Sequence, residues 1–174
     1  ANASTITMDG DFISSAGTFT FDTSTIVFAV SGTLTTTAGD RGTNTVYNVT
    51  VNTAITMTAG SIIGFGNTLT LTGSAIFARA GQTTVFNFDS ADDFVCGATA
   101  QLDAAAGLLV WNPSADLNLP ACTYDGNMQF ENGATGTRTY TATGTLTFTD
   151  ATAANYIADI VGANGDVISA ANSR

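Results

Sequence analysis

Residues 67–74, Asn-Thr-Leu-Thr-Leu-Thr-Gly-Ser, decide the fold class of this chain. Threonine alternates there with leucine, and turn-forming residues follow at once. An alternation of period two places one set of side chains on the buried face of a β-strand and the other set on the solvated face. The pattern recurs in the triplets Thr5-Ile6-Thr7, Thr33-Leu34-Thr35, Thr139-Tyr140-Thr141 and Thr145-Leu146-Thr147. We therefore predict a chain built of short, threonine-rich strands.

These strands predict an all-β, single-domain protein. The chain has 174 residues, enough to bury about 70% of its unfolded surface around one core. Its 32 threonines favour strands over helices. Similar short sequences begin near residues 33 and 68, and a second similar pair begins near residues 45 and 84. They suit a β-solenoid with coils of roughly 18 to 20 residues or a β-sandwich, and the sequence leaves these two architectures open.

Residues 46–74 resemble the repeats of secreted β-helical surface proteins and adhesins. The resemblance is one of composition and rests on three phrases: residues 47–51 (Tyr-Asn-Val-Thr-Val), residues 55–60 (Ile-Thr-Met-Thr-Ala-Gly) and residues 67–74. It implies an extracellular protein without a catalytic role, and it brings no site residues with it.

The charge balance excludes several partners and chemistries. Charged residues make up 10% of the chain, the net charge is -10, and there is no lysine or histidine. The four cations are Arg41, Arg79, Arg138 and Arg174. Scattered arginines in an acidic chain cannot form the cationic footprint that nucleic acid or an anionic membrane requires, and the apolar runs are too short for membrane insertion. Without histidine and lysine, triad and Schiff-base chemistry are excluded, and we expect no enzyme.

Two groups of acids remain as candidate calcium ligands. One is Asp9 with Asp11, and the other is Asp89 with Asp92 and Asp93. Carboxylates on turns are ligands that calcium prefers, but neither group matches a complete calcium-binding loop. We interpret both groups as solvated turns and expect no cofactor.

Cys96 and Cys122 are the only cysteines. An even count in a lysine-free, threonine-rich chain predicts one disulfide in an exported protein. The segment between them is rich in alanine and leucine and holds both prolines, Pro113 and Pro120. We predict a loop over 96–122 that the disulfide staples, with a short strand at 108–111 and, as an option, a helical turn before it.

Export and glycosylation are two linked expectations. The sequence begins at Ala1 without an initiator methionine, which we interpret as removal of a signal peptide and hence an extracellular or cell-surface location. Two sequons, Asn2-Ala3-Ser4 and Asn48-Val49-Thr50, make Asn2 and Asn48 candidates for N-glycans. Such triplets also arise by chance in a sequence this rich in threonine and asparagine.

The N-terminal segment is a candidate donor strand. It consists of Ser4, Thr5, Ile6, Thr7 and Met8, and the turn Asp9-Gly10-Asp11 follows it. The strand can pair within its own chain, or residues 1–9 can be exchanged onto the domain of residues 10–174 in a neighbouring copy. Head-to-tail exchange generates a filament. We therefore predict a non-enzymatic structural subunit of an extracellular filament or surface assembly, with copies of itself as partners.

Other functions suit the same pattern. A surface adhesin or carbohydrate-binding module, with a glycan as partner, would present exposed aromatic residues, whereas we expect Trp111 to lie in the core. A virion decoration or fibre protein would share the architecture. An ice-binding solenoid would present ranks of Thr-x-Thr, but such proteins stack the triplets at one constant coil length, and the intervals here vary.

Overall fold

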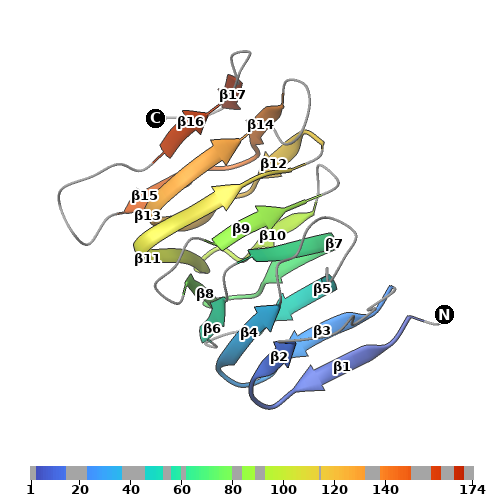
Figure 1. Ribbon diagram of the computed structural model, residues 1–174. Coiled ribbons are helices and arrows are strands. Elements are labelled where there is room, and N and C mark those ends of the chain that lie inside the picture. Colours follow the sequence, from blue (N-terminus) through green and yellow to red (C-terminus); the bar gives the residue numbers. More distant parts are fainter. Residues whose placement is uncertain are drawn as a thin grey trace.

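The structure is a parallel β-solenoid, which confirms the all-β prediction and selects the solenoid from the two architectures. The computed structural model describes residues 3–14, 23–36, 46–52, 56–59, 62–79, 84–88, 93–113, 115–131, 138–149, 158–161 and 167–170. Within these residues every strand pairing is parallel. The strands stack along one axis, from β1 at the bottom of Figure 1 to β16 and β17 at its top.

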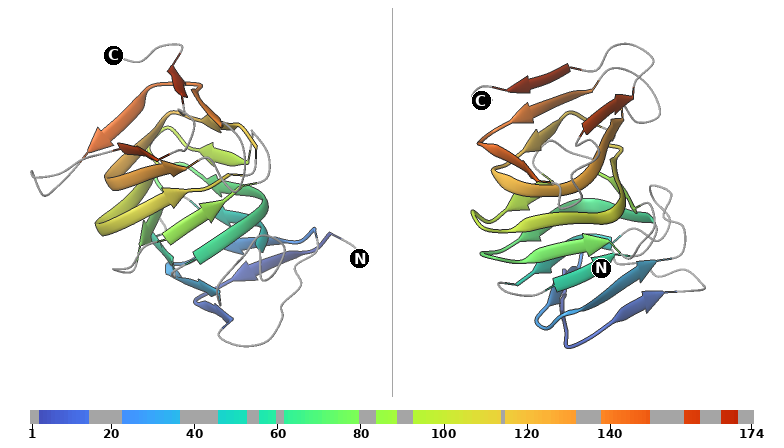
Figure 2. Two further views of the ribbon diagram at one scale, coloured as in Figure 1. Left: turned by 45° about the horizontal axis from the view of Figure 1, so that its top comes forward. Right: turned by 90° about the vertical axis from the view of Figure 1, so that its left-hand side faces the viewer.

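The strands form three faces of the solenoid, named here in the order in which the chain visits them. The first face holds β1 (Thr5–Met8), β3 (Thr25–Phe28), β5 (Val46–Val51), the end of β7 (Ile62–Leu71) and β10 (Phe94–Cys96), followed by the separate sheet β12 (Leu117–Leu119), β14 (Thr139–Ala142) and β17 (Val167–Ala170). The second face begins with β2 (Phe12–Ser14), β4 (Gly32–Thr36), β6 (Thr56–Ala59) and β8 (Ile76–Arg79). It continues with the first residues of the long strands β11 (Gln101–Trp111) and β13 (Cys122–Glu131), and it ends with β15 (Leu146–Thr149). The third face holds the start of β7, β9 (Thr84–Asn87), the ends of β11 and β13, and β16 (Ala158–Val161). Figure 2 shows the successive coils in layers.

The coils differ in length, which corrects the expectation of 18 to 20 residues. Thr5 pairs with Thr25, so that coil takes 20 residues, whereas Leu69 pairs with Phe94 and that coil takes 25. The similar short sequences near residues 33 and 68 do not occupy equivalent positions in the solenoid. The first of these residues lies in β4 on the second face and the other in β7 on the first face. This sequence similarity therefore reflects the composition of the strands and not the period of the solenoid.

Glycines build the corner between the first and second faces. A Cβ atom on Gly32 would lie 2.6 Å from the carbonyl oxygen of Gly10, and one on Gly97 would lie 2.5 Å from the backbone nitrogen of Gly73. Gly73 itself has a φ of 54°, in the left-handed region that favours glycine. Successive coils thus approach closely here because these positions lack a side chain.

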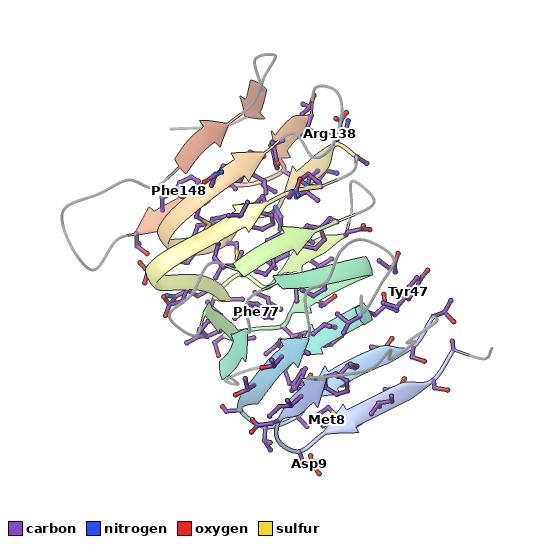
Figure 3. The ribbon with its side chains drawn as sticks, in the orientation of Figure 1. Met8, Asp9, Tyr47, Phe77, Arg138 and Phe148 are labelled. Atoms are coloured by element: carbon purple, nitrogen blue, oxygen red, sulfur yellow. A yellow bond between two sulfur atoms is a disulfide. The ribbon has the colours of Figure 1, made fainter. Side chains whose placement is uncertain are left out.

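An aromatic column fills the centre of the solenoid. Phe65 stacks on Phe88 with ring centroids 5.2 Å apart, Phe88 stacks on Trp111 at 5.7 Å, and Trp111 stacks on Phe130 at 6.0 Å. These distances are close to the spacing of about 4.8 Å between neighbouring strands, because the rings come from successive coils. Other buried rings, Phe77 among them, surround the column (Figure 3). The central coils are therefore held by offset-stacked rings as well as by backbone hydrogen bonds.

The segment 96–122, which the disulfide closes, contains the strands β11 and β12. Residues 101–111 form the single strand β11, with a register irregularity between Asp103 and Leu108. No helical turn precedes residue 108, so that option was wrong. The alanines there lie in strand conformation because β11 pairs with β8 and β9 on one side and with β13 on the other.

Candidate functional site

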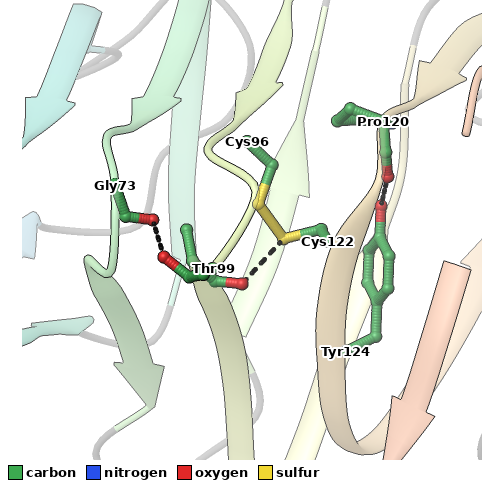
Figure 4. Close-up of a disulfide and its surroundings, with 7 residues drawn as sticks. Gly73, Cys96, Thr99, Pro120, Cys122 and Tyr124 are labelled. Atoms are coloured by element: carbon green, nitrogen blue, oxygen red, sulfur yellow. Dashed lines mark hydrogen bonds between the residues drawn. A yellow bond between two sulfur atoms is a disulfide. The ribbon is translucent and has the colours of Figure 1, made fainter. Parts of the chain in front are cut away.

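The disulfide predicted from the cysteine count is present and joins two successive coils. Cys96 ends β10 on the first face, and Cys122 begins β13 on the second face, with a Cα–Cα distance of 5.7 Å and a sequence separation of 26 residues (Figure 4). Closing a loop of this length stabilises a fold by about 3.5 kcal/mol on the chain-entropy model. The bond therefore reinforces the corner at which the coils approach closely.

Hydrogen bonds lie on both sides of the disulfide (Figure 4). The hydroxyl of Thr99 donates to the carbonyl oxygen of Gly73 at 2.9 Å, which ties one coil to the coil before it. The phenol of Tyr124 donates to the carbonyl oxygen of Pro120 at 3.0 Å. Burial raises the pKa of Tyr124 well above the ordinary value of a phenol, so it stays a neutral donor. Both of these side chains thus donate to backbone carbonyl oxygens.

The candidate donor strand is paired in its own chain. β1 runs parallel to β3, with Thr5 opposite Thr25 and Met8 opposite Phe28. Residues 5–7 are exposed, and only Met8 packs against the core (Figure 3). The backbone amide of Thr25 also donates to the carbonyl oxygen of Ser4, at 2.8 Å. β1 therefore closes one side of β3 while burying little of its own surface.

The first coil, β1 and β2, has an open outer edge among the residues that the structure describes. β1 pairs with β3 alone and β2 with β4 alone. Two large apolar side chains on this coil are exposed, Ile6 at 36% and Ile13 at 61%. Unpaired strand edges next to exposed apolar residues are where additional β-structure docks. This coil is accordingly the candidate interaction site.

Three of the five candidate calcium ligands, Asp9, Asp11 and Asp93, lie in the described part of the chain. Asp9 is exposed, whereas Asp11 accepts a hydrogen bond from the backbone amide of Thr33 at 2.8 Å and so links two coils. Asp89 and Asp92 lie outside the described residues. The remaining acid of that group, Asp93, is 3% exposed, so its interpretation as a solvated turn residue was wrong. In the described part of the chain, no three acidic or cysteine side chains gather as metal ligands.

The two sequons differ in how far the structure describes them. Asn2 lies outside the described residues. Asn48 lies within β5 and is half-buried; its side-chain nitrogen donates to the hydroxyl of Thr25 at 3.2 Å, and its oxygen accepts from Asn67 at 2.7 Å. Sequence analysis missed this ladder of three side chains. The separation of 19 residues between the two asparagines, close to the length of a coil, was the available signal.

Trp111 is fully buried, which agrees with its assignment to the core. Its indole Nε1 has no hydrogen-bond partner within the described structure. Tyr124, Tyr140 and most phenylalanines of the described residues are buried as well. Among the described aromatic side chains, Phe12, Tyr47 and Phe148 are half-buried and remain partly exposed.

The outward sides of the first and second faces differ in charge. The register partners on the outward side of the first face between residues 5 and 70 are threonine, valine and asparagine, and the half-buried Tyr47 lies beside Asn48 in β5. On the second face, Asp103 and Asp125 lie next to each other in register. Asp125 accepts hydrogen bonds from Gln101 at 3.1 Å and from Thr149 at 2.8 Å. The outward side of the first face is therefore uncharged over these residues, whereas the second face carries the carboxylates of Asp103 and Asp125.

No family model, curated protein or solved structure matches the chain. Its class is consequently defined by the fold alone: it is a parallel β-solenoid protein with one disulfide. A search of the described residues for a helix that is long and apolar enough to cross a membrane finds none.

Proposed function

We propose that this protein is a non-enzymatic structural subunit of an extracellular filament or surface assembly, joined to neighbouring copies through its first coil. The observation that carries the proposal is the open, partly apolar edge of that coil. The rest of the described solenoid supplies a rigid body, because stacked rings and a disulfide hold its central coils together.

Backbone groups give the edge its capacity to associate. Half of the N–H and C=O groups of an edge strand point away from the sheet, and another strand that lies beside them completes the ladder. β1 and β2 contain no charged residue that would oppose a second strand. Natural edges that avoid association use such charges, prolines or bulges. The first coil has none of these within its two strands.

The home pairing of β1 leaves its inward residue Ile6 partly exposed, which favours strand exchange over simple addition of a neighbour. The strand shares four register pairs with β3. Its inward residue Ile6 is 36% exposed, whereas the inward residues Ile26 and Phe28 of β3 are fully buried. Exchange would replace the contacts of β1 with identical contacts from a neighbouring copy, so the loss at home is offset in the assembly.

An extracellular location is part of the proposal. The disulfide supports it, because such bonds persist in oxidising compartments and are rare in the cytosol. The scarcity of charged residues and the many threonines give the surface the composition that the resemblance to secreted β-helical proteins implies.

Electron microscopy of the concentrated protein tests the proposal, with the exchange controlled by an engineered crosslink. Thr7 and Val27 are register partners on adjacent strands, about 4.8 Å apart, within the range that a disulfide spans. We expect the wild type to form fibres and the double variant Thr7→Cys with Val27→Cys, once oxidised, to stay monomeric because β1 cannot leave. The matched control, Thr50→Cys with Thr70→Cys, joins β5 to β7 in the same way and should still form fibres.

Three results would count against this account. Dispersed wild-type monomers at every concentration would contradict the structural role. Fibres formed by the locked variant would contradict strand exchange and leave addition to the outer edge of β1 as the mode of assembly. A peptide of residues 1–9 that fails to bind a variant lacking residues 1–9, with a scrambled peptide as reference, would also contradict exchange.

A further inference from the structure

The outward side of the first face carries a regular array of hydroxyl groups. We define the threonine face as the outward residues in two ranks: Thr5, Thr25, Asn48 and Thr68 in the first rank, and Thr7, Val27, Thr50 and Thr70 in the second. The residues of each rank are register partners on successive strands. Between the two ranks, the side chains of residues 26, 49 and 69 point inward and are fully buried.

Unequal coil lengths leave these ranks intact. The steps from Thr5 to Thr25, from Thr25 to Asn48 and from Asn48 to Thr68 take 20, 23 and 20 residues. The strands nevertheless pair in register at the residues of both ranks, and a register irregularity lies beside the first rank, between Val46 and Asn48. Variable spacing in the sequence is therefore no argument against a regular surface, because the additional residues of the longer coil lie between the strands of this face.

The array is preorganised. Asn67 donates to Asn48, and Asn48 donates to Thr25, so hydrogen bonds fix much of the first rank. Threonine is branched at Cβ, which restricts its side chain to few rotamers on a strand. In the part of the chain that the structure describes, no hydrogen bond uses the hydroxyl groups of Thr7, Thr50 and Thr70. These groups lose little side-chain entropy when they bind a ligand and break no internal bond.

Neutrality and spacing together indicate the ligand. The eight residues carry no charge, although the whole chain has a net charge of -10. Neighbouring residues of one rank lie about 4.8 Å apart along the solenoid, and the two ranks lie about 6.6 Å apart along each strand. Every position carries a hydroxyl group except Asn48 and Val27. A neutral mesh of fixed hydroxyl and methyl groups at these intervals is close to the mesh of oxygen atoms on the surface of ice. Many weak contacts that form at once can hold such a flat lattice.

We propose that the threonine face binds ice. The water lattice would lie across the four coils, with the hydroxyl groups as hydrogen-bond partners and the methyl groups in contact with its open rings. Crystalline polysaccharide is the less suitable flat ligand, because its recognition relies on aromatic platforms, and none of the eight residues of the threonine face is aromatic. This proposal does not rest on filament formation, since monomer and filament would present the same face.

Ice shaping and inhibition of ice recrystallisation test the proposal. We expect the wild type to produce faceted ice crystals and to slow recrystallisation at micromolar concentration. The variant Thr50→Tyr places a bulky ring in the middle of the array and should lose at least tenfold in activity. The matched control Thr123→Tyr lies outward on the second face, opposite Gln101 and next to Asp125, and should keep wild-type activity. Circular dichroism must show that both variants keep the wild-type fold.

Several outcomes would overturn the proposal. Round, unshaped ice crystals with the folded wild type would do so directly. Equal loss of activity in both variants would show that the threonine face is not the binding surface. Binding to microcrystalline cellulose or chitin without any effect on ice would replace ice with a polysaccharide as the ligand.

Discussion

Two triplets of the same kind have different environments in the first coil and in a central coil. Thr5-Ile6-Thr7 in β1 and Thr68-Leu69-Thr70 in β7 both lie on the first face with the middle residue directed inward. Leu69 is fully buried, whereas Ile6 is 36% exposed. Alternation in the sequence therefore determines which side of the strand faces inward, but it does not determine how deeply that side is buried.

The number of neighbouring coils explains the difference in burial between Leu69 and Ile6. Leu69 lies between Val49 of the preceding coil and Phe94 of the following coil, whereas Ile6 has Ile26 on one side only. Burial of apolar area is the main source of stability, at about 25 cal/mol per Å². The central coils should therefore be the stable part of the molecule and the first coil the part that opens most easily.

Removal of the central ring should have the largest effect. We expect Trp111→Ala to lower the free energy of unfolding by about 3–5 kcal/mol, because it leaves a cavity in the aromatic column. Trp111→Phe keeps a ring for Phe88 and Phe130 to stack on and removes the unpartnered indole N–H. The decrease in the free energy of unfolding should therefore be much smaller for Trp111→Phe than for Trp111→Ala. Urea unfolding with an unchanged m-value measures both effects, and equal losses in the two variants would contradict a stacking role.

The paired truncations Leu69→Ala and Ile6→Ala compare the two coils directly. We expect a loss of about 2–5 kcal/mol at Leu69, a typical value for a buried leucine, and less than about 1 kcal/mol at Ile6 because it is partly exposed. Urea unfolding of the two variants under identical conditions provides the measurement. Similar losses would mean that the first coil is covered as fully as the central one.

The glycine corner should have an intermediate effect. Gly97→Ala places a Cβ within 2.5 Å of the backbone nitrogen of Gly73, and overpacking of this kind lowers stability by about 1–3 kcal/mol. Ser74→Ala changes an exposed residue at the same corner and serves as the control. Thermal unfolding followed by circular dichroism compares them; a Gly97→Ala variant as stable as the control would show that the coils can separate here without loss.

The smallest effect concerns alkaline pH. Burial raises the pKa of Tyr124, so the folded state holds the phenolic proton more tightly than the unfolded state. Its contribution to stability is complete below about pH 10, the ordinary pKa of tyrosine, and falls as the pH rises further. Tyr124→Phe should lose about 1 kcal/mol at neutral pH with the bond to Pro120. Its stability should then fall less steeply than that of the wild type above pH 10, and parallel declines would contradict this.

Much of the architecture could be predicted from local pattern. Alternation predicted the strands, the cysteine count predicted the disulfide, and the general preference of tryptophan for the interior predicted the burial of Trp111. The strand at residues 108–111 was predicted, but its beginning at residues 101–107 was not, because the alanines there favour a helix and only pairing with neighbouring strands makes the segment extended.

The candidate surfaces could not be recognised from the sequence, because this requires knowing the register in which the strands pair. Residues 48 and 67 reveal a ladder only when their strands are known to be neighbours, and the threonine face is regular although its intervals in the sequence are not. The burial of Asp93 likewise depends on what packs over it. Contacts between coils lie about 20 to 25 residues apart in the sequence, beyond the reach of local pattern.

Hydrogen–deuterium exchange, measured on the dilute monomer and again at concentrations at which the protein assembles, tests the central claim most directly. We predict that amides of β1 and β3 exchange faster than those of β7, β11 and β13 in the monomer. On assembly, β1 and β3 should become protected while the central strands stay unchanged. Equal protection of the first and central coils in the monomer, or an assembled state in which β1 and β3 exchange as fast as before, would contradict the account.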